Sequence, residues 1–100
     1  MIGMVKNRTK QKRVITKTGR LTSEQMESIF KDDSNVIRCM EELTKKNLDN
    51  YIVGYSSFYY KNCRVGEVYK EESKEDGITY YLITDVMSNN KFYCYSIYEK

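Results

Sequence analysis

The sequence predicts an α+β domain. It begins with a basic N-terminal arm, continues with two short helices in a helix-turn-helix-like hairpin, and ends in an antiparallel sheet of three to five strands, open or curled into a small barrel. Three observations predict this order: residues 1–20 are basic and lack an apolar period, residues 21–48 have helical apolar spacing, and residues 50–100 alternate aromatic or β-branched residues with polar ones. A length of 100 residues suits one globular domain over residues 21–100, with residues 1–20 as a flexible arm.

The arm concentrates positive charge. It contains no Asp or Glu and seven cationic residues, which are Lys6, Arg8, Lys10, Lys12, Arg13, Lys17 and Arg20. The remaining eighty residues hold ten Lys or Arg against fourteen Asp or Glu, so the body is acidic although the whole chain has a formal charge of +3. A basic segment of this kind is typical of a phosphate-contacting arm, and it also suits a solvated terminus.

The two helices are predicted from their starting signals and apolar stripes. Thr22 and Gln25 form a capping-box pattern, and Met26, Ile29 and Phe30 then share one face of the first helix. In the second helix a common face is formed by Val36, Ile37, Met40 and Leu43. Both helices should be short and should bury one face.

The C-terminal half is predicted to be a sheet. Strand-like segments occupy residues 50–61, 63–70, 77–87 and 91–99. A two-residue turn at Asn89 and Asn90 would place Val86 opposite Tyr93. Because both faces of this hairpin are rich in apolar or aromatic residues, we expect one face to pack on the helices and the other to be covered by a fold-back of the chain or by a partner.

Residues 21–55 resemble the centre of a winged-helix domain, since a helix pair is followed by a strand. The resemblance implies that the second helix would present Asn35 to adenine and Arg38 to guanine or phosphate. Asp32 and Asp33 nearby would oppose a polyanion. A plain α-hairpin packed on a sheet fits the same residues.

Ten tyrosines are more than a core of this size normally takes, because each buried hydroxyl needs a hydrogen-bond partner. The segment "YSSFYY" predicts a protein-contact surface formed by Tyr55, Phe58, Tyr59 and Tyr60. Homodimerisation through an aromatic sheet face is compatible with this surface. The alternative is that tyrosine replaces other apolar residues because of the base composition of an AT-rich genome.

Residue usage argues against most catalytic and metal-binding constellations. The chain has no histidine, and its three cysteines are too widely spaced for a zinc knuckle. We therefore expect a non-enzymatic protein without a metal or cofactor. No apolar run is long enough for a membrane span and no secretory signal follows the basic start, so we expect a cytoplasmic protein with no membrane contact.

Two functions remain. The first is nucleic-acid association, with DNA or RNA phosphates contacting the arm and tyrosines supplying further contacts. The second is an inhibitor or adaptor of the kind that phages and mobile elements encode, which binds a host protein such as a defence nuclease.

Overall fold

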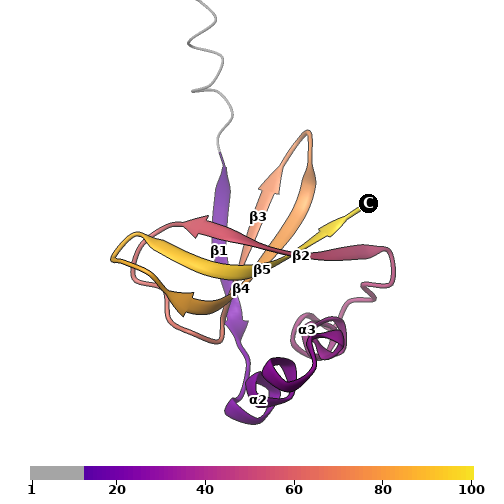
Figure 1. Ribbon diagram of the computed structural model, residues 1–100. Helices are drawn as coiled ribbons and strands as arrows, with labels where there is room; N and C mark the ends of the chain where they lie inside the picture. Colours follow the sequence, from indigo (N-terminus) through magenta and orange to yellow (C-terminus); the bar gives the residue numbers. More distant parts are fainter. Residues whose placement is uncertain (1–12) are drawn as a thin grey trace, which may run out of the picture.

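The computed structural model describes residues 13–100. Its elements, in chain order, are β1 Val14–Arg20, α2 Ser23–Lys31, the 3-10 turn η1 Asp33–Asn35, α3 Val36–Thr44, β2 Tyr51–Tyr59, β3 Glu67–Ser73, β4 Gly77–Val86 and β5 Lys91–Glu99 (Figure 1). The prediction of two helices and an antiparallel sheet is confirmed, with five strands in the sheet.

The two helices begin and end at identifiable signals. The hydroxyl oxygen of Thr22 accepts the Gln25 amide at 3.1 Å and the Gln25 side chain accepts the Thr22 amide at 2.9 Å, so the predicted capping box is present. α3 ends at Lys45, which adopts a left-handed conformation. Met26 and Ile29 are buried as predicted, but Phe30 is 58% exposed, so its prediction as a core residue is wrong.

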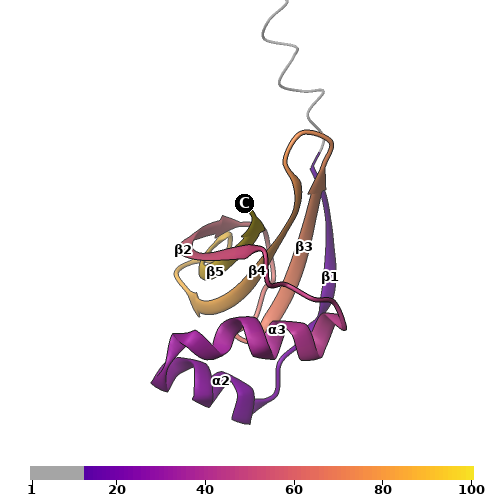
Figure 2. The ribbon, with the colours of Figure 1, turned by 90° about the vertical axis from the view of Figure 1, so that its right-hand side faces the viewer.

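The strands form one open antiparallel sheet in the order β1-β3-β4-β5-β2. β1 and β2 are its two edges, and they do not pair with each other among the described residues. The sheet is therefore not closed into a barrel. α2 and α3 form a layer against one side of it (Figures 1 and 2).

The sheet is nevertheless strongly curled. In a flat sheet, strands three positions apart lie roughly 14 Å apart, yet the ring of Phe58 on β2 lies 5.8 Å from that of Tyr69 on β3. The same ring stacks on Tyr81 of β4 at 4.5 Å. The curl thus brings the end of β2 over the side of the sheet that faces away from the helices.

Each side of the sheet holds a core. We call the side against the helices the helix face; its core includes Val36, Met40, Leu82 and Ile97. The other side is the inner face, where the curl encloses a second core made of Phe58, Cys63, Tyr69, Ile83, Phe92 and Cys94. The sequence predicts that the second face is covered either by a fold-back of the chain or by a partner. In the structure, the curled end of β2 folds back over it.

The predicted register of the β4–β5 hairpin is wrong. Val86 pairs with Phe92 rather than Tyr93, because the Met87 amide donates to Lys91 and the turn therefore has three residues instead of two. An irregularity between Ile83 and Asp85 shifts the pairing by one further residue, so Leu82 lies opposite Tyr95. The division into two apolar faces survives, since Leu82 and Ile83 still point to opposite sides.

The boundary of the basic arm at residue 20 also needs correction. Val14–Arg20 form strand β1, which pairs along β3 with an irregularity between Lys17 and Gly19. The apolar signal in this segment is weak because only its inward residues, such as Ile15, pack on the second core. Lys6, Arg8, Lys10 and Lys12 lie outside the described residues.

Candidate functional site

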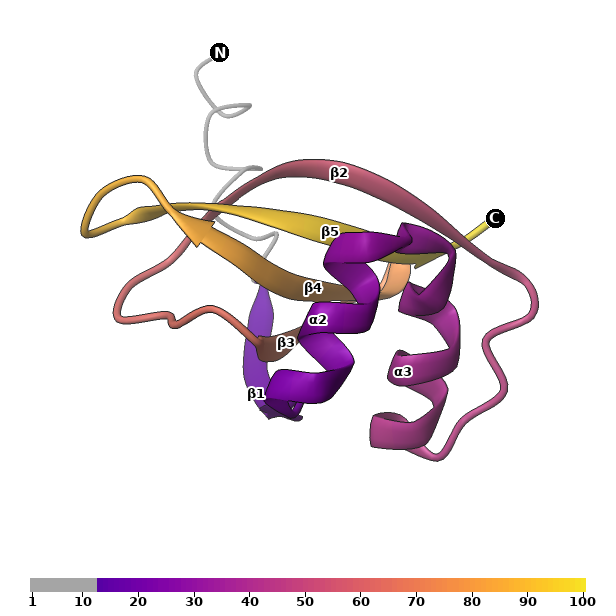
Figure 3. The same cartoon turned by 60° about the horizontal axis from the view of Figure 1, so that its bottom comes forward.

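Four tyrosines gather on the helix face beyond the helices. Tyr55 and Tyr59 come from β2, and Tyr93 and Tyr95 come from β5; we call these four residues the tyrosine tract. Residues two or four positions apart on a strand point to the same face. Tyr55 and Tyr59 therefore share a face of β2, and Tyr93 and Tyr95 share a face of β5. The end of the β4–β5 hairpin extends past α2 and α3 (Figure 3). Tyr95 packs against the core on the helix face, whereas Tyr55 and Tyr59 are exposed.

Tyr55 lies at the centre of the tract. Its ring is 5.1 Å from that of Tyr95, in an edge-to-face arrangement, and 6.0 Å from that of Tyr93. Its hydroxyl reaches Thr84 on β4 at 2.7 Å. These contacts hold the ring across β5 and leave 57% of the residue exposed. Tyr55 therefore presents a large, ordered aromatic surface with a polar tip.

The tract is flanked by a few charges of both signs. The ammonium group of Lys91 lies 5.8 Å from the ring centroid of Tyr59, which is 60% exposed. Asp85 pairs with Tyr93 across the hairpin. Burial, and next the charge of Asp33 in η1, raise the pKa of Tyr95. The mixture gives the tract no strong field of one sign.

The predicted contact group divides between surface and core. Tyr55 and Tyr59 are exposed, whereas Phe58 is 2% exposed and belongs to the second core. Tyr60 packs against the same core, with its ring 5.6 Å from Phe58 and 5.5 Å from Tyr69. Phe58 points to the inner face because it has opposite parity to its neighbours on β2. The predicted contact group did not include Tyr93 and Tyr95, which the β2–β5 register brings beside Tyr55.

Two of the predicted phosphate-binding cations are paired within the chain. Arg13 forms an ion pair with Glu71 of β3, and Glu71 also accepts the hydroxyl of Tyr81. The Lys17 ammonium lies 2.7 Å from a carboxylate oxygen of Glu67. Both contacts follow from the pairing of β1 with β3, which aligns a basic strand with an acidic one. Arg20 is exposed and has no ion pair within residues 13–100.

Glu67 is held as a carboxylate inside the fold. Burial by itself would raise the pKa of Glu67, but hydrogen bonds from Lys17, the Arg64 amide and the Tyr69 hydroxyl bring that pKa below its usual value. Burial and the same carboxylate raise the pKa of Tyr69. Lys17 is thus part of a structural network of the inner face.

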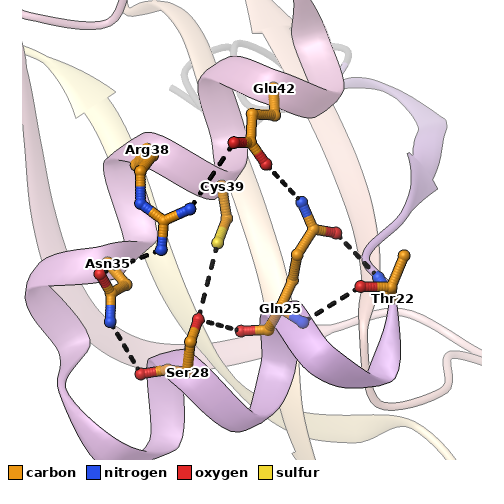
Figure 4. A network of polar contacts seen from close by, with 7 residues as sticks. All are labelled: Thr22, Gln25, Ser28, Asn35, Arg38, Cys39 and Glu42. Atoms are coloured by element: carbon orange, nitrogen blue, oxygen red, sulfur yellow. Dashed lines mark hydrogen bonds and ion pairs between the residues drawn. The ribbon is translucent and has the colours of Figure 1, made fainter.

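The predicted base-reading residues join the two helices (Figure 4). The Asn35 side chain donates to the carbonyl of Ser28 at 2.9 Å and accepts from Arg38 at 3.1 Å. Arg38 also lies 3.6 Å from Glu42, which accepts a hydrogen bond from Gln25. These bonds engage the side-chain amide of Asn35 and part of the guanidinium of Arg38, and they connect α2 with α3.

A hollow of about 280 Å³ opens on the inner face near the β3–β4 turn. Its lining includes the carboxylates of Glu71, Asp76 and Glu99 together with Tyr81 and Tyr98. The Glu71 carboxylate at its side is already engaged by Arg13 and Tyr81. The described part of the chain has no group of three Cys, Asp or Glu side chains that could hold a metal ion.

The three cysteines, Cys39, Cys63 and Cys94, are buried free thiols. Burial raises the pKa of Cys63 and of Cys94, which keeps both as thiols at neutral pH. Over residues 13–100, no helix has the length and apolar character needed to cross a bilayer. Comparison of the chain with protein-family models, with curated proteins and with solved structures found no match.

Proposed function

We propose that this chain is a non-enzymatic protein-binding module, an inhibitor or adaptor, whose contact surface is the tyrosine tract. The observation that carries the proposal is the exposure of Tyr55 and Tyr59, at 57% and 60%, on a strand without a charged residue. Tyrosine contributes a large rigid area at a low entropic cost, and it is enriched among residues that dominate binding at protein interfaces.

The charges around the tract favour a protein over a nucleic acid as the ligand. Binding to a phosphate backbone is dominated by Lys and Arg contacts. Lys91 is accompanied by Asp33 and Asp85 near the tract, while Arg13 and Lys17 are engaged by carboxylates on the inner face. A partner that presents apolar side chains and hydrogen-bonding groups matches this surface better than a polyanion does. The buried free thiols suit a reducing cytoplasm, which we include in the proposal.

The test is recovery of bound protein from the source cells with the tagged full-length chain, followed by nuclease treatment. We expect the bound protein to resist nuclease, to be lost with the double variant Tyr59→Ala/Tyr93→Ala, and to be retained with Tyr98→Ala. Tyr98 is a matched control, since it is 39% exposed but lines the hollow on the other face. Partners that disappear on nuclease treatment, or that bind both variants equally, would contradict the proposal.

Nucleic-acid association is a second candidate, favoured by the positive charge of residues 6–12 and by the exposed Arg20. In that function the tyrosine tract would stack on unpaired bases. Its test is the salt dependence of affinity for DNA and RNA, because phosphate contacts give a steep decrease in affinity with salt.

A further inference from the structure

The two edges of the sheet differ in how they are protected from pairing with another chain. β1 carries Lys17 and Arg20 and has an irregularity beside Gly19, all of which are devices that discourage pairing at an edge. β2 has none of them. Its nine residues, "YIVGYSSFY", include no charge and no proline, and they pair with β5 along their whole length without a register shift.

The outward backbone groups of β2 belong to its odd-numbered residues. At one end the Tyr60 amide donates to Asn90, and at the other the Lys100 amide donates to Asn50. Since hydrogen-bonded pairs alternate along an antiparallel ladder, the even-numbered residues face β5 and the odd-numbered ones face outward. Val53, Tyr55, Ser57 and Tyr59 therefore direct their amides and carbonyls away from the sheet. No backbone hydrogen bond from these four residues to anything outside their own strand pair occurs within residues 13–100.

The order of the outward residues is nearly symmetric. Reading along the strand they are Tyr51, Val53, Tyr55, Ser57 and Tyr59. A twofold axis at Tyr55 would place Tyr55 beside its own copy, Val53 beside Ser57, and Tyr51 beside Tyr59. On the inner face the same axis places Gly54 beside Ser56, both of which are small.

We propose that β2 pairs antiparallel with β2 of a second copy of this chain, with the twofold axis at Tyr55. This inference rests on the proposed function, because it joins the two tyrosine tracts into one continuous contact surface. The pairing would form about eight backbone hydrogen bonds, with the amide of Tyr51 already bonded to Leu48. Both helix layers would lie on the same side of the joined sheet.

The charges beside the new contact are compatible with this pairing. Tyr51 lies opposite Glu99 and Tyr59 lies opposite Lys91 in the β2–β5 register. When Tyr51 of one copy meets Tyr59 of the other, each cross-strand row contains Glu99 from one copy and Lys91 from the other. The proposed axis thus places unlike charges in the same row and brings no like charges together.

Sedimentation over a wide concentration range tests the proposal, with full-length wild type and with Tyr55→Lys and Tyr55→Glu variants. We expect wild type to dimerise and each variant to weaken dimerisation about tenfold or more, since the axis places two like charges side by side. Mixing the two variants should restore a heterodimer. Tyr98→Lys is the matched control and should dimerise as wild type does, and circular dichroism should show the same fold for every variant.

Each outcome is decisive. A monomer at all concentrations, a dimer that tolerates Tyr55→Lys, or a mixture of variants that fails to associate would overturn the twofold pairing. The proposed function is judged separately by the Tyr59→Ala/Tyr93→Ala variant. If wild type is monomeric and the Tyr59→Ala/Tyr93→Ala variant loses a bound protein of another kind, the pairing with a second copy is overturned. The proposed function of the tyrosine tract as a contact surface is then supported.

Discussion

The ammonium nitrogen of Lys17 lies 2.7 Å from a carboxylate oxygen of Glu67, a residue that is only 5% exposed. The other carboxylate oxygen accepts the amide of Arg64 and the hydroxyl of Tyr69. One cation of the basic N-terminal segment therefore satisfies an acid inside the fold. Because a buried carboxylate without its partner is costly, this pair should contribute to stability more than an exposed ion pair does.

A double-mutant cycle measures that difference. Lys17→Met should lower the free energy of unfolding by about 1–3 kcal/mol, because it leaves the buried carboxylate of Glu67 without a cation and one of its oxygens without a hydrogen bond. The coupling between Lys17→Met and Glu67→Gln, measured by urea unfolding, should exceed that between Lys70→Met and Glu72→Gln. The second pair, 3.1 Å apart, is the control because the carboxylate of Glu72 is exposed, and it should couple by at most about 1 kcal/mol. Equal couplings would show that Glu67 is solvated in solution.

The same carboxylate predicts a dependence of stability on pH. The pKa of Glu67 in the folded chain is below its ordinary value, so the unfolded chain binds more protons in the window between the two values. The contribution of the Glu67 carboxylate to the free energy of unfolding is fully present above the unfolded pKa of about 4.3, and it is lost as the pH falls through the folded pKa. Unfolding free energies measured from about pH 6 to about pH 3 should fall less steeply for Glu67→Gln than for wild type. An unchanged slope would contradict this assignment.

Residue parity along β2 predicts a sharp contrast between two neighbours. Phe58 stacks on Tyr81 in the second core, whereas Tyr59 is 60% exposed. Phe58→Ala should cost about 3–5 kcal/mol of unfolding free energy, and Tyr59→Ala should change it by roughly 0.5 kcal/mol. Thermal or urea unfolding of both variants checks the assignment. A reversed order would mean that β2 presents its other face to the inner core.

Local signals in the sequence were sufficient to predict the two helices and the presence of an antiparallel sheet, but not the register of the sheet or its edge strand β1. The capping box needs only Thr22 and Gln25, which are three positions apart, and its prediction is confirmed. β1 was predicted as an arm because its stability depends on β3, about fifty residues away, which supplies Glu67 and Glu71. The exposed and buried members of "YSSFYY" could not be separated, since both faces of this sheet carry a core and alternation alone does not identify the outer one.

Two glycines predict substitutions of opposite effect. Gly66 has φ +94°, a backbone conformation that residues with a side chain rarely adopt, and its amide donates to the carbonyl of Ile83 at 2.8 Å. Gly66→Ala should therefore destabilise the fold by about 1–2 kcal/mol. Gly54 lies within β2, and a Cβ there would meet only Tyr98 at 3.8 Å. Gly54→Ala should be neutral or stabilising by up to about 1 kcal/mol. Thermal unfolding of the two variants gives the comparison.

Neutralising the segment before β1 separates the two candidate functions. In the full-length variant with Lys6, Arg8, Lys10 and Lys12 all replaced by Gln, the tyrosine tract is unchanged. Protein binding through the tract should therefore be retained, as measured by recovery of the nuclease-resistant partner. If the chain binds duplex DNA through these residues instead, the slope of log affinity against log salt should become shallower by roughly 3–4, because each phosphate contact contributes about 0.9. Arg13 and Lys17 already pair with Glu71 and Glu67, so Arg20 is the one predicted phosphate contact without an ion pair in the described part of this variant. A residual slope much steeper than one contact gives would indicate that those two ion pairs open when the ligand binds.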